Sequence, residues 1–109
     1  MVFDRAVLIE RLAGDEDLAG EIVDDYLDSI PRTMEALKEA LQDGDRAKIE
    51  HQAHSMKGAS ATVGAGILYA IAAQLEQAGK AGNLDEAASL ISRLDREFVK
   101  LKEAIADQR

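Results

Sequence analysis

Apolar side chains recur at intervals of three and four residues along most of the chain, which places them on one face of a helix. The clearest case is the C-terminal quarter, where steps of three and four alternate as they do in a helix at the seam of a bundle. These positions are Leu84, Ala87, Ile91, Leu94, Phe98, Leu101 and Ile105. No segment shows the strict alternation of a half-buried strand. The pattern therefore predicts an all-α fold.

Turn residues divide the chain into five predicted helices. Gly14 and Gly44 are each followed by an aspartate, so one residue ends a helix and the next caps the following helix. Residues 64–66 and 79–82 supply two further glycine-rich loops, and Asn83 with Glu86 has the spacing of a capping box. The predicted helices cover residues 4–13, 15–42, 45–63 and 67–78, and a last one carries the apolar positions from 84 to 105.

The order of these helices predicts the architecture. Short loops make neighbouring helices antiparallel, so we expect an up-down four-helix bundle with a short extra N-terminal helix, in a single domain over residues 1–109. Pro31 falls inside the second helix, where it removes a backbone donor and clashes with the preceding turn. We therefore expect a kink near Asp28 to Ile30.

Composition narrows the possible functions. The chain has 109 residues, 47% of them hydrophobic, and a formal net charge of −8, which argues against nucleic acid or an anionic membrane as partner. It has no cysteine, which excludes disulfides, thiolate metal sites and a cysteine nucleophile. There is no apolar run long enough to span a bilayer and no signal-peptide pattern at the N-terminus. We therefore expect a cytoplasmic location, although a domain of a larger, membrane-anchored protein would show the same features.

The third predicted helix carries a histidine on the side away from the core. At 100° per residue, with His54 at zero, the apolar residues Ile49, Met56 and Val63 fall at about 180–220°. A buried core histidine fits this arrangement poorly, whereas a solvated surface histidine fits it well. The side that His54 occupies also includes Ala47, Glu50, His51, Lys57, Gly58 and Ala61.

Gly58 is the unexpected residue on this face. Glycine inside a helix costs about 0.5–1 kcal/mol relative to alanine, and close approach of a partner is the simplest reason to accept that cost. Neutral imidazole can attack phosphorus near neutral pH, and a cation three residues away, Lys57, can stabilise the phosphoryl group. The face therefore favours a histidine, His54, that carries a phosphoryl group and is contacted by another protein.

The segment AHSMKGASATVGA at residues 53–65 resembles the signature of histidine-containing phosphotransfer (HPt) domains. The resemblance extends over the whole chain, from the proline in the second helix to Glu97-Phe98 in the last. The P1 domains of chemotaxis histidine kinases have a similar segment, but no ATP-binding motif is found in this sequence. The matching positions of the signature are Ala53, His54, Met56, Lys57, Gly58, Ser60, Val63, Gly64 and Ala65.

The resemblance implies a module of multistep phosphorelays. A receiver domain would pass the phosphoryl group of its phosphoaspartate to His54 Nε2, and His54 would pass it to another receiver. Lys57 would help to hold the phosphoryl group, and Gly58 would leave room for the receiver. Glu76 matches a polar position, often glutamine in relatives, whose side chain bonds the other ring nitrogen. A carboxylate there would favour the tautomer with hydrogen on Nδ1. The Mg²⁺ that transfer requires would sit in the receiver, so we expect no cofactor or metal in this chain.

The resemblance also suggests how a receiver would dock. We expect the docking face to include His51, Ser55 and Ala61 beside Gly58, and exposed parts of the first two helices. The residues expected from the first helix are Leu8, Ile9 and Leu12. The expected partners are receiver domains of response regulators, with a hybrid sensor histidine kinase in the same chain as a further possibility. We expect a monomer.

Three other functions have weaker support in the sequence. His51, His54 and Glu50 could bind a divalent metal, but such a site needs further ligands and supporting hydrogen bonds. A pseudo-HPt adaptor would bind receivers without accepting phosphate, and loss of the histidine or lysine, both present here, would favour it. An enzyme would need a nucleotide-binding loop or an oxyanion loop near Ser55 or Ser60, and neither pattern occurs. We therefore predict a phosphocarrier that is not an enzyme.

Overall fold

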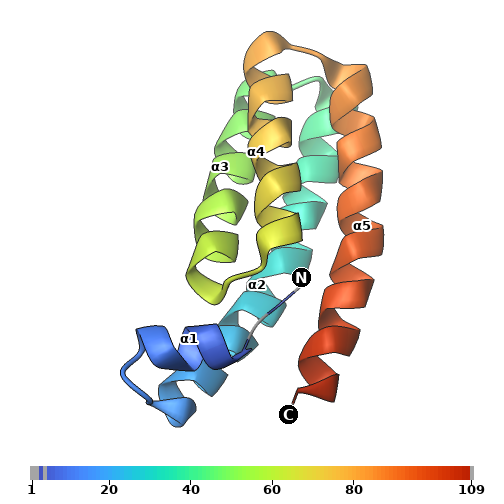
Figure 1. Ribbon diagram of the computed structural model, residues 1–109. Helices are drawn as coiled ribbons and strands as arrows, with labels where there is room; N and C mark the ends of the chain where they lie inside the picture. Colours follow the sequence, from blue (N-terminus) through green and yellow to red (C-terminus); the bar gives the residue numbers. More distant parts are fainter. Residues whose placement is uncertain (1–2, 4, 109) are drawn as a thin grey trace.

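The structure, a computed structural model, describes residue 3 and residues 5–108. In this part of the chain every regular element is a helix, which confirms the all-α prediction. Helices α2 to α5 run antiparallel to their neighbours in an up-down bundle, and α1 lies across the end where α2 and α5 extend past the α3–α4 connection (Figure 1). The elements are α1 (Arg5–Arg11), α2 (Glu16–Asp43), α3 (Arg46–Val63), α4 (Gly66–Ala81) and α5 (Leu84–Asp107).

The predicted caps define where the helices begin. The side chain of Asp15 accepts a hydrogen bond from Leu18 N at 3.0 Å, and that of Asp45 accepts one from Lys48 N at 3.1 Å. Gly44, at φ 67°, ends α2 in the left-handed conformation that glycine adopts without strain. The first helix is shorter than the predicted range of 4–13: α1 spans residues 5–11, and Asp4 lies outside the described residues.

The start of α5 forms only part of the predicted capping box. Asn83 Oδ1 accepts from Glu86 N at 3.1 Å, as expected. The backbone N–H of Asn83, which a capping box would direct to Glu86, instead donates to Ala78 O at 2.9 Å in the last turns of α4. Glu86 Oε2 accepts a hydrogen bond at 3.2 Å from the side-chain amide of Asn83 rather than from its backbone N–H.

The prediction that residues 79–82 form a loop is wrong for residues 79–81. Helix α4 continues to Ala81, and Gly79 is buried within it. A Cβ at this position would lie 2.8 Å from the backbone nitrogen of Glu50 and 3.1 Å from the carbonyl oxygen of Arg46, both on α3. The glycine therefore serves a close approach of α3 and α4, which local sequence does not distinguish from a loop signal.

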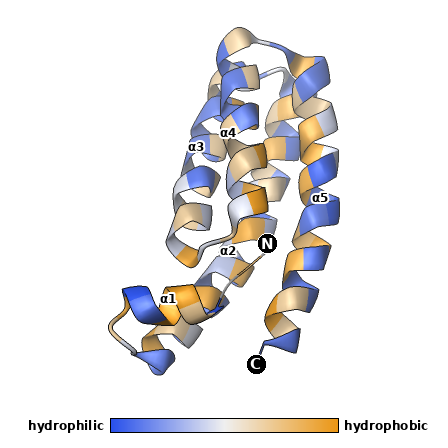
Figure 2. Cartoon of the chain, viewed as in Figure 1, coloured by the Kyte–Doolittle hydropathy of each residue, from blue (hydrophilic) through white to orange (hydrophobic). Residues whose placement is uncertain are grey.

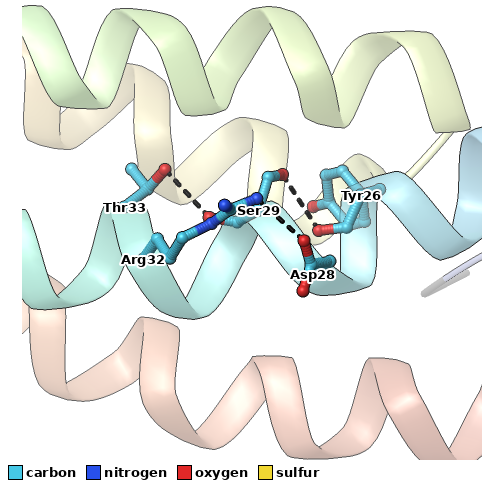
Figure 3. A network of polar contacts seen from close by, with 5 residues as sticks. All are labelled: Tyr26, Asp28, Ser29, Arg32 and Thr33. Atoms are coloured by element: carbon cyan, nitrogen blue, oxygen red, sulfur yellow. Dashed lines mark hydrogen bonds and ion pairs between the residues drawn. The ribbon is translucent and has the colours of Figure 1, made fainter.

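Helix α2 runs without a break through Pro31, which has no backbone N–H to donate. Two side-chain hydroxyls bond carbonyl groups in this stretch: Ser29 Oγ donates to Tyr26 O at 3.1 Å, and Thr33 Oγ1 donates to Ser29 O at 3.2 Å (Figure 3). The helix is thus continuous across the proline, and the kink expected near Asp28 to Ile30 stays a prediction.

The core is aliphatic and confirms the pattern in the C-terminal quarter. Apolar and polar residues alternate along α5 (Figure 2), and six of its seven predicted core positions, from Ala87 to Ile105, are buried. One polar contact crosses the core between α2 and α3, where Tyr26 Oη and Ser60 Oγ lie 2.8 Å apart. Burial raises the pKa of Tyr26 to about 12, although the contact with Ser60 acts in the opposite direction.

Val7 of α1 is exposed, but the apolar residues predicted for the docking face at this end of the chain lie against the core. The side chain of Leu8 is buried, with 2% of the residue exposed, and Ile9 and Leu12 pack partly buried against the core. The expectation that Leu8 belongs to an exposed docking face is therefore wrong. Because α1 covers the protruding end of the bundle, its apolar stripe is needed to complete the core there.

The two glycines Gly79 and Gly20 lie inside helices in opposite environments, which makes them a test of the packing. We predict that Gly79→Ala lowers the free energy of unfolding by about 1–3 kcal/mol, because the added methyl overlaps the α3 backbone. A Cβ at Gly20 would meet no atom within 4 Å. Gly20→Ala should therefore raise the free energy of unfolding by about 0.5–1 kcal/mol.

Urea denaturation of both variants and the wild type measures these changes. An equal gain in stability for the two variants would show that α3 and α4 can separate at no cost, contrary to the close approach described here.

Candidate functional site

His54 lies in the middle of α3 on the face that points away from the core. Its side chain is 68% exposed, whereas Ile49, Met56 and Val63 of the same helix are buried. The helical periodicity therefore placed the histidine correctly. The Asp45 cap fixes where α3 begins. The buried residues of the helix fix which of its faces packs in the core, and His54 lies on the opposite, exposed face.

A single buried carboxylate on α4 joins the two key residues of α3. The side chain of Glu76 is 8% exposed; its Oε2 lies 2.6 Å from His54 Nδ1 and its Oε1 lies 2.7 Å from Lys57 Nζ. Gly79 follows Glu76 by one turn and allows α4 to approach the α3 backbone closely. The structure thus brings together the three residues that the sequence proposed as acceptor, phosphoryl-holding and orienting groups.

The ion pair keeps Glu76 charged. The hydrogen bond from Lys57 lowers the pKa of the Glu76 carboxyl, burial opposes that change, and the contact with His54 lowers the pKa further. The same hydrogen bond to Glu76 raises the pKa of Lys57, with burial acting in the opposite direction. The stabilisation from Glu76 is therefore present above an unfolded-state pKa of about 4.3 and lost as the pH falls through the lower folded-state pKa. That from Lys57 is present below about 10.4 and lost as the pH rises through the raised pKa.

The ionised carboxylate determines the tautomer of His54. A carboxylate can only accept hydrogen bonds, so in the neutral imidazole Nδ1 carries the hydrogen and Nε2 carries the lone pair. No described residue forms a hydrogen bond with Nε2. The nitrogen that can act as a nucleophile is therefore on an exposed ring and has no competing partner within the described protein.

Gly58 is exposed one turn after His54, and a Cβ there would meet no atom within 4 Å. No contact inside the described chain thus requires a glycine at this position, in contrast to Gly79. The bare backbone beside the imidazole faces outward, where a partner could approach.

Three other residues predicted for the docking face lie on the same helix as His54. His51, Ser55 and Ala61 are all exposed on α3. His51 lines a shallow hollow beside the acceptor, together with Ala47, Glu50, His54 and Glu76. Over residue 3 and residues 5–108, no group of three or more histidine, cysteine or acidic side chains is arranged to hold a metal ion.

Two residues near this face were not identified from the sequence. Arg11 Nη1 donates to Ala61 O at 3.2 Å, so the end of α1 contacts the end of α3. Tyr69, on α4, is 42% exposed and lies near enough to Lys57 to contribute slightly to the rise in its pKa, after Glu76. Fifty residues separate Arg11 from Ala61, and no local spacing reveals such a contact.

None of the helices described is both long and apolar enough to cross a membrane.

Comparisons with known proteins identify the family of this fold. The family model of the Hpt domain matches residues 21–106. The crystal structure of histidine-containing phosphotransfer protein B (HptB) from Pseudomonas aeruginosa PAO1 is similar, with 30% sequence identity and a TM-score of 0.90 over 98% of this chain and 93% of that one. The HPT domain of an Hpt sensor hybrid histidine kinase from Shewanella shares the fold, with a TM-score of 0.76 and 23% identity over 97% and 95% of the two chains.

A search of curated protein sequences found no match. The family model nevertheless covers most of the chain, and the similarity to HptB extends over nearly all of it. The chain therefore belongs to the family of Hpt domains.

Proposed function

We propose that this chain is a phosphorelay carrier in which His54 accepts a phosphoryl group on Nε2 from the phosphoaspartate of a receiver domain. His54 then passes the phosphoryl group to the aspartate of another receiver. The observation that supports this proposal most directly is the bond between Glu76 and Nδ1, which leaves the lone pair on the exposed Nε2. Relatives of both kinds, a phosphotransfer protein and a domain of a hybrid kinase, share the fold.

The transfer exchanges one bond to phosphorus for another. Nε2 of the neutral ring attacks the phosphorus of the acyl phosphate, the Nε2–P bond forms, and the P–O bond to the aspartate breaks as its carboxylate leaves. Nδ1 keeps its hydrogen, so the phosphorylated ring gains a positive charge. The Glu76 carboxylate, 2.6 Å from Nδ1, stabilises that charge. In the return step the same bonds are exchanged in reverse.

Lys57 supplies the cation for the phosphoryl oxygens. It lies one turn from His54 and is held by Glu76, so its ammonium is positioned beside the ring before the phosphoryl group arrives. A positive charge that is already in place lowers the energy of the transferring group without a large rearrangement.

The receiver is proposed to supply the remaining chemistry. We place no metal or cofactor in this chain, and the Mg²⁺ that transfer uses would be bound by the acidic pocket of the receiver. The exposed backbone at Gly58 allows that pocket to reach Nε2. On this proposal the chain acts as a monomeric carrier in the cytoplasm and does not act as a kinase.

The assignment of the acceptor is tested by labelling two histidine variants in parallel. We predict that phosphoramidate and phosphorylated receiver domains place an acid-labile, base-stable label on the wild type and on His51→Gln, but not on His54→Gln. His51 is the matched control because it is exposed on the same face of α3. Circular dichroism should show the same helical content in all three proteins.

Label on His54→Gln would contradict the assignment of His54. If neither phosphoramidate nor any receiver labelled the wild type, a pseudo-HPt adaptor that binds receivers would replace the carrier.

Substitutions at Gly58 separate docking from stability. Gly58→Ala should raise the free energy of unfolding by about 0.5–1 kcal/mol, since its methyl group meets no atom of the chain. Gly58→Leu should lower the rate of transfer from a receiver by roughly tenfold or more, because the side chain occupies the space that the receiver needs. Labelling by phosphoramidate, which is small, should change little. Receiver transfer to Gly58→Leu at the wild-type rate would show that the bare backbone has another purpose.

A further inference from the structure

Arg11 is a basic residue within an acidic part of the chain. Between Arg5 and Arg32 it is the only lysine or arginine, whereas eight aspartates and glutamates occur there. These acidic residues are all exposed, and they are Glu10, Asp15, Glu16, Asp17, Glu21, Asp24, Asp25 and Asp28. The negative net charge of the chain therefore does not explain why a cation occurs at this position.

The structure directs this cation to the helix that carries the acceptor. Arg11 Nη1 donates to Ala61 O at 3.2 Å, and Ala61 follows His54 by two turns on the same face of α3. Two turns correspond to about 10.5 Å along a helix. Among the described residues the guanidinium has no other bonded partner, so its remaining donors are available to a partner protein.

Arg11 and Tyr69 line one surface hollow. We call this hollow, between α1 and the α3–α4 connection, the Arg11 hollow; it is lined by Arg11, Ser60, Ala61, Gly64, Gly66 and Tyr69. Its small residues expose backbone between an arginine and an exposed tyrosine, the side-chain types most often found at the energetic centres of interfaces. Ala61, which lines the hollow, follows Lys57 by one turn of α3, so the hollow adjoins the surface around His54.

On the basis of the proposed function, we propose that the Arg11 hollow is a second docking area for the receiver domain, beside His54. Arg11 and Tyr69 would bind an acidic part of the receiver surface next to the phosphoaspartate pocket. An interface that buries about 800 Å² on each partner has a radius of roughly 16 Å, so an area about 10 Å from the acceptor falls inside it.

Charge complementarity favours a receiver as the occupant. The carboxylates around a phosphoaspartate would be repelled by the eight acidic residues between Arg5 and Arg32 and attracted by Lys57 and Arg11. The two cations therefore define one favourable orientation for an acidic partner on an acidic protein. Nucleic acid is a poor occupant because the chain carries a formal net charge of −8.

The test compares two charge reversals of equal size. Arg11→Glu changes the charge at the hollow, whereas Arg93→Glu changes an exposed residue of α5. Helix α5 lies across the bundle from α3 (Figure 1). Arg93 has no bonded partner among the described residues. We expect Arg11→Glu to lower kcat/KM for transfer from a phosphorylated receiver by about tenfold at low salt, with a smaller loss at high salt. Arg93→Glu should stay within about twofold of the wild type.

Two further variants separate contact from fold. Tyr69→Ala should slow receiver transfer by about tenfold and leave the thermal midpoint unchanged, because the side chain is exposed. Arg11→Gln removes the charge but retains a donor for Ala61 O, and should give a loss smaller than that of Arg11→Glu. All variants should accept label from phosphoramidate at the wild-type rate.

The outcomes distinguish this inference from the proposed function. Normal receiver transfer to Arg11→Glu and Tyr69→Ala, with the wild type active, would overturn the docking area alone. Equal losses in Arg11→Glu and Arg93→Glu would also overturn it, since net charge would then explain the effect. A wild type that phosphoramidate cannot label would overturn the proposed function, and this inference with it.

Discussion

The buried carboxylate of Glu76 organises the site, because it binds His54 and Lys57 at the same time. Removing a carboxylate from water is unfavourable unless its oxygens find partners, and here each oxygen has one. The two bonds hold an imidazole and an ammonium side by side on an exposed face. They depend in turn on the close packing of α3 and α4, which Gly79 permits one turn further along α4. The chemistry of His54 is thus linked to a helix contact on the neighbouring turn.

The bundle separates two requirements that a phosphoryl carrier must meet. One face of α3 packs in an aliphatic core and fixes the helix, while the opposite face stays open around His54. Two glycines show this division between packing and access. Gly79 is required by a neighbouring helix, whereas Gly58 has no neighbour within the described chain. Stability and access for a partner are therefore carried by different residues of one small fold.

Much of the fold could be predicted from the sequence because its signals are local. The caps at Asp15 and Asp45 and the heptad-like spacing in α5 act within one helix or one turn. The errors involve contacts between distant segments. The sequence predicts a loop at Gly79 because it does not show that α3 packs against this residue. It predicts that Leu8 is exposed because it does not show that α1 covers the end of the bundle. The contact of Arg11 with α3 is of the same kind.

In the proposed function, Glu76 holds neutral His54 with hydrogen on Nδ1, so that Nε2 is the phosphoryl acceptor. Nitrogen-15 NMR of the His54 imidazole tests this role directly, in the wild type and in Glu76→Gln, before and after labelling with phosphoramidate. We expect the Nδ1–H tautomer in the neutral wild-type ring, phosphorus bonded to Nε2 after labelling, and a less uniform tautomer in Glu76→Gln. A wild-type ring with hydrogen on Nε2, or a phosphoryl group on Nδ1, would contradict this role of Glu76.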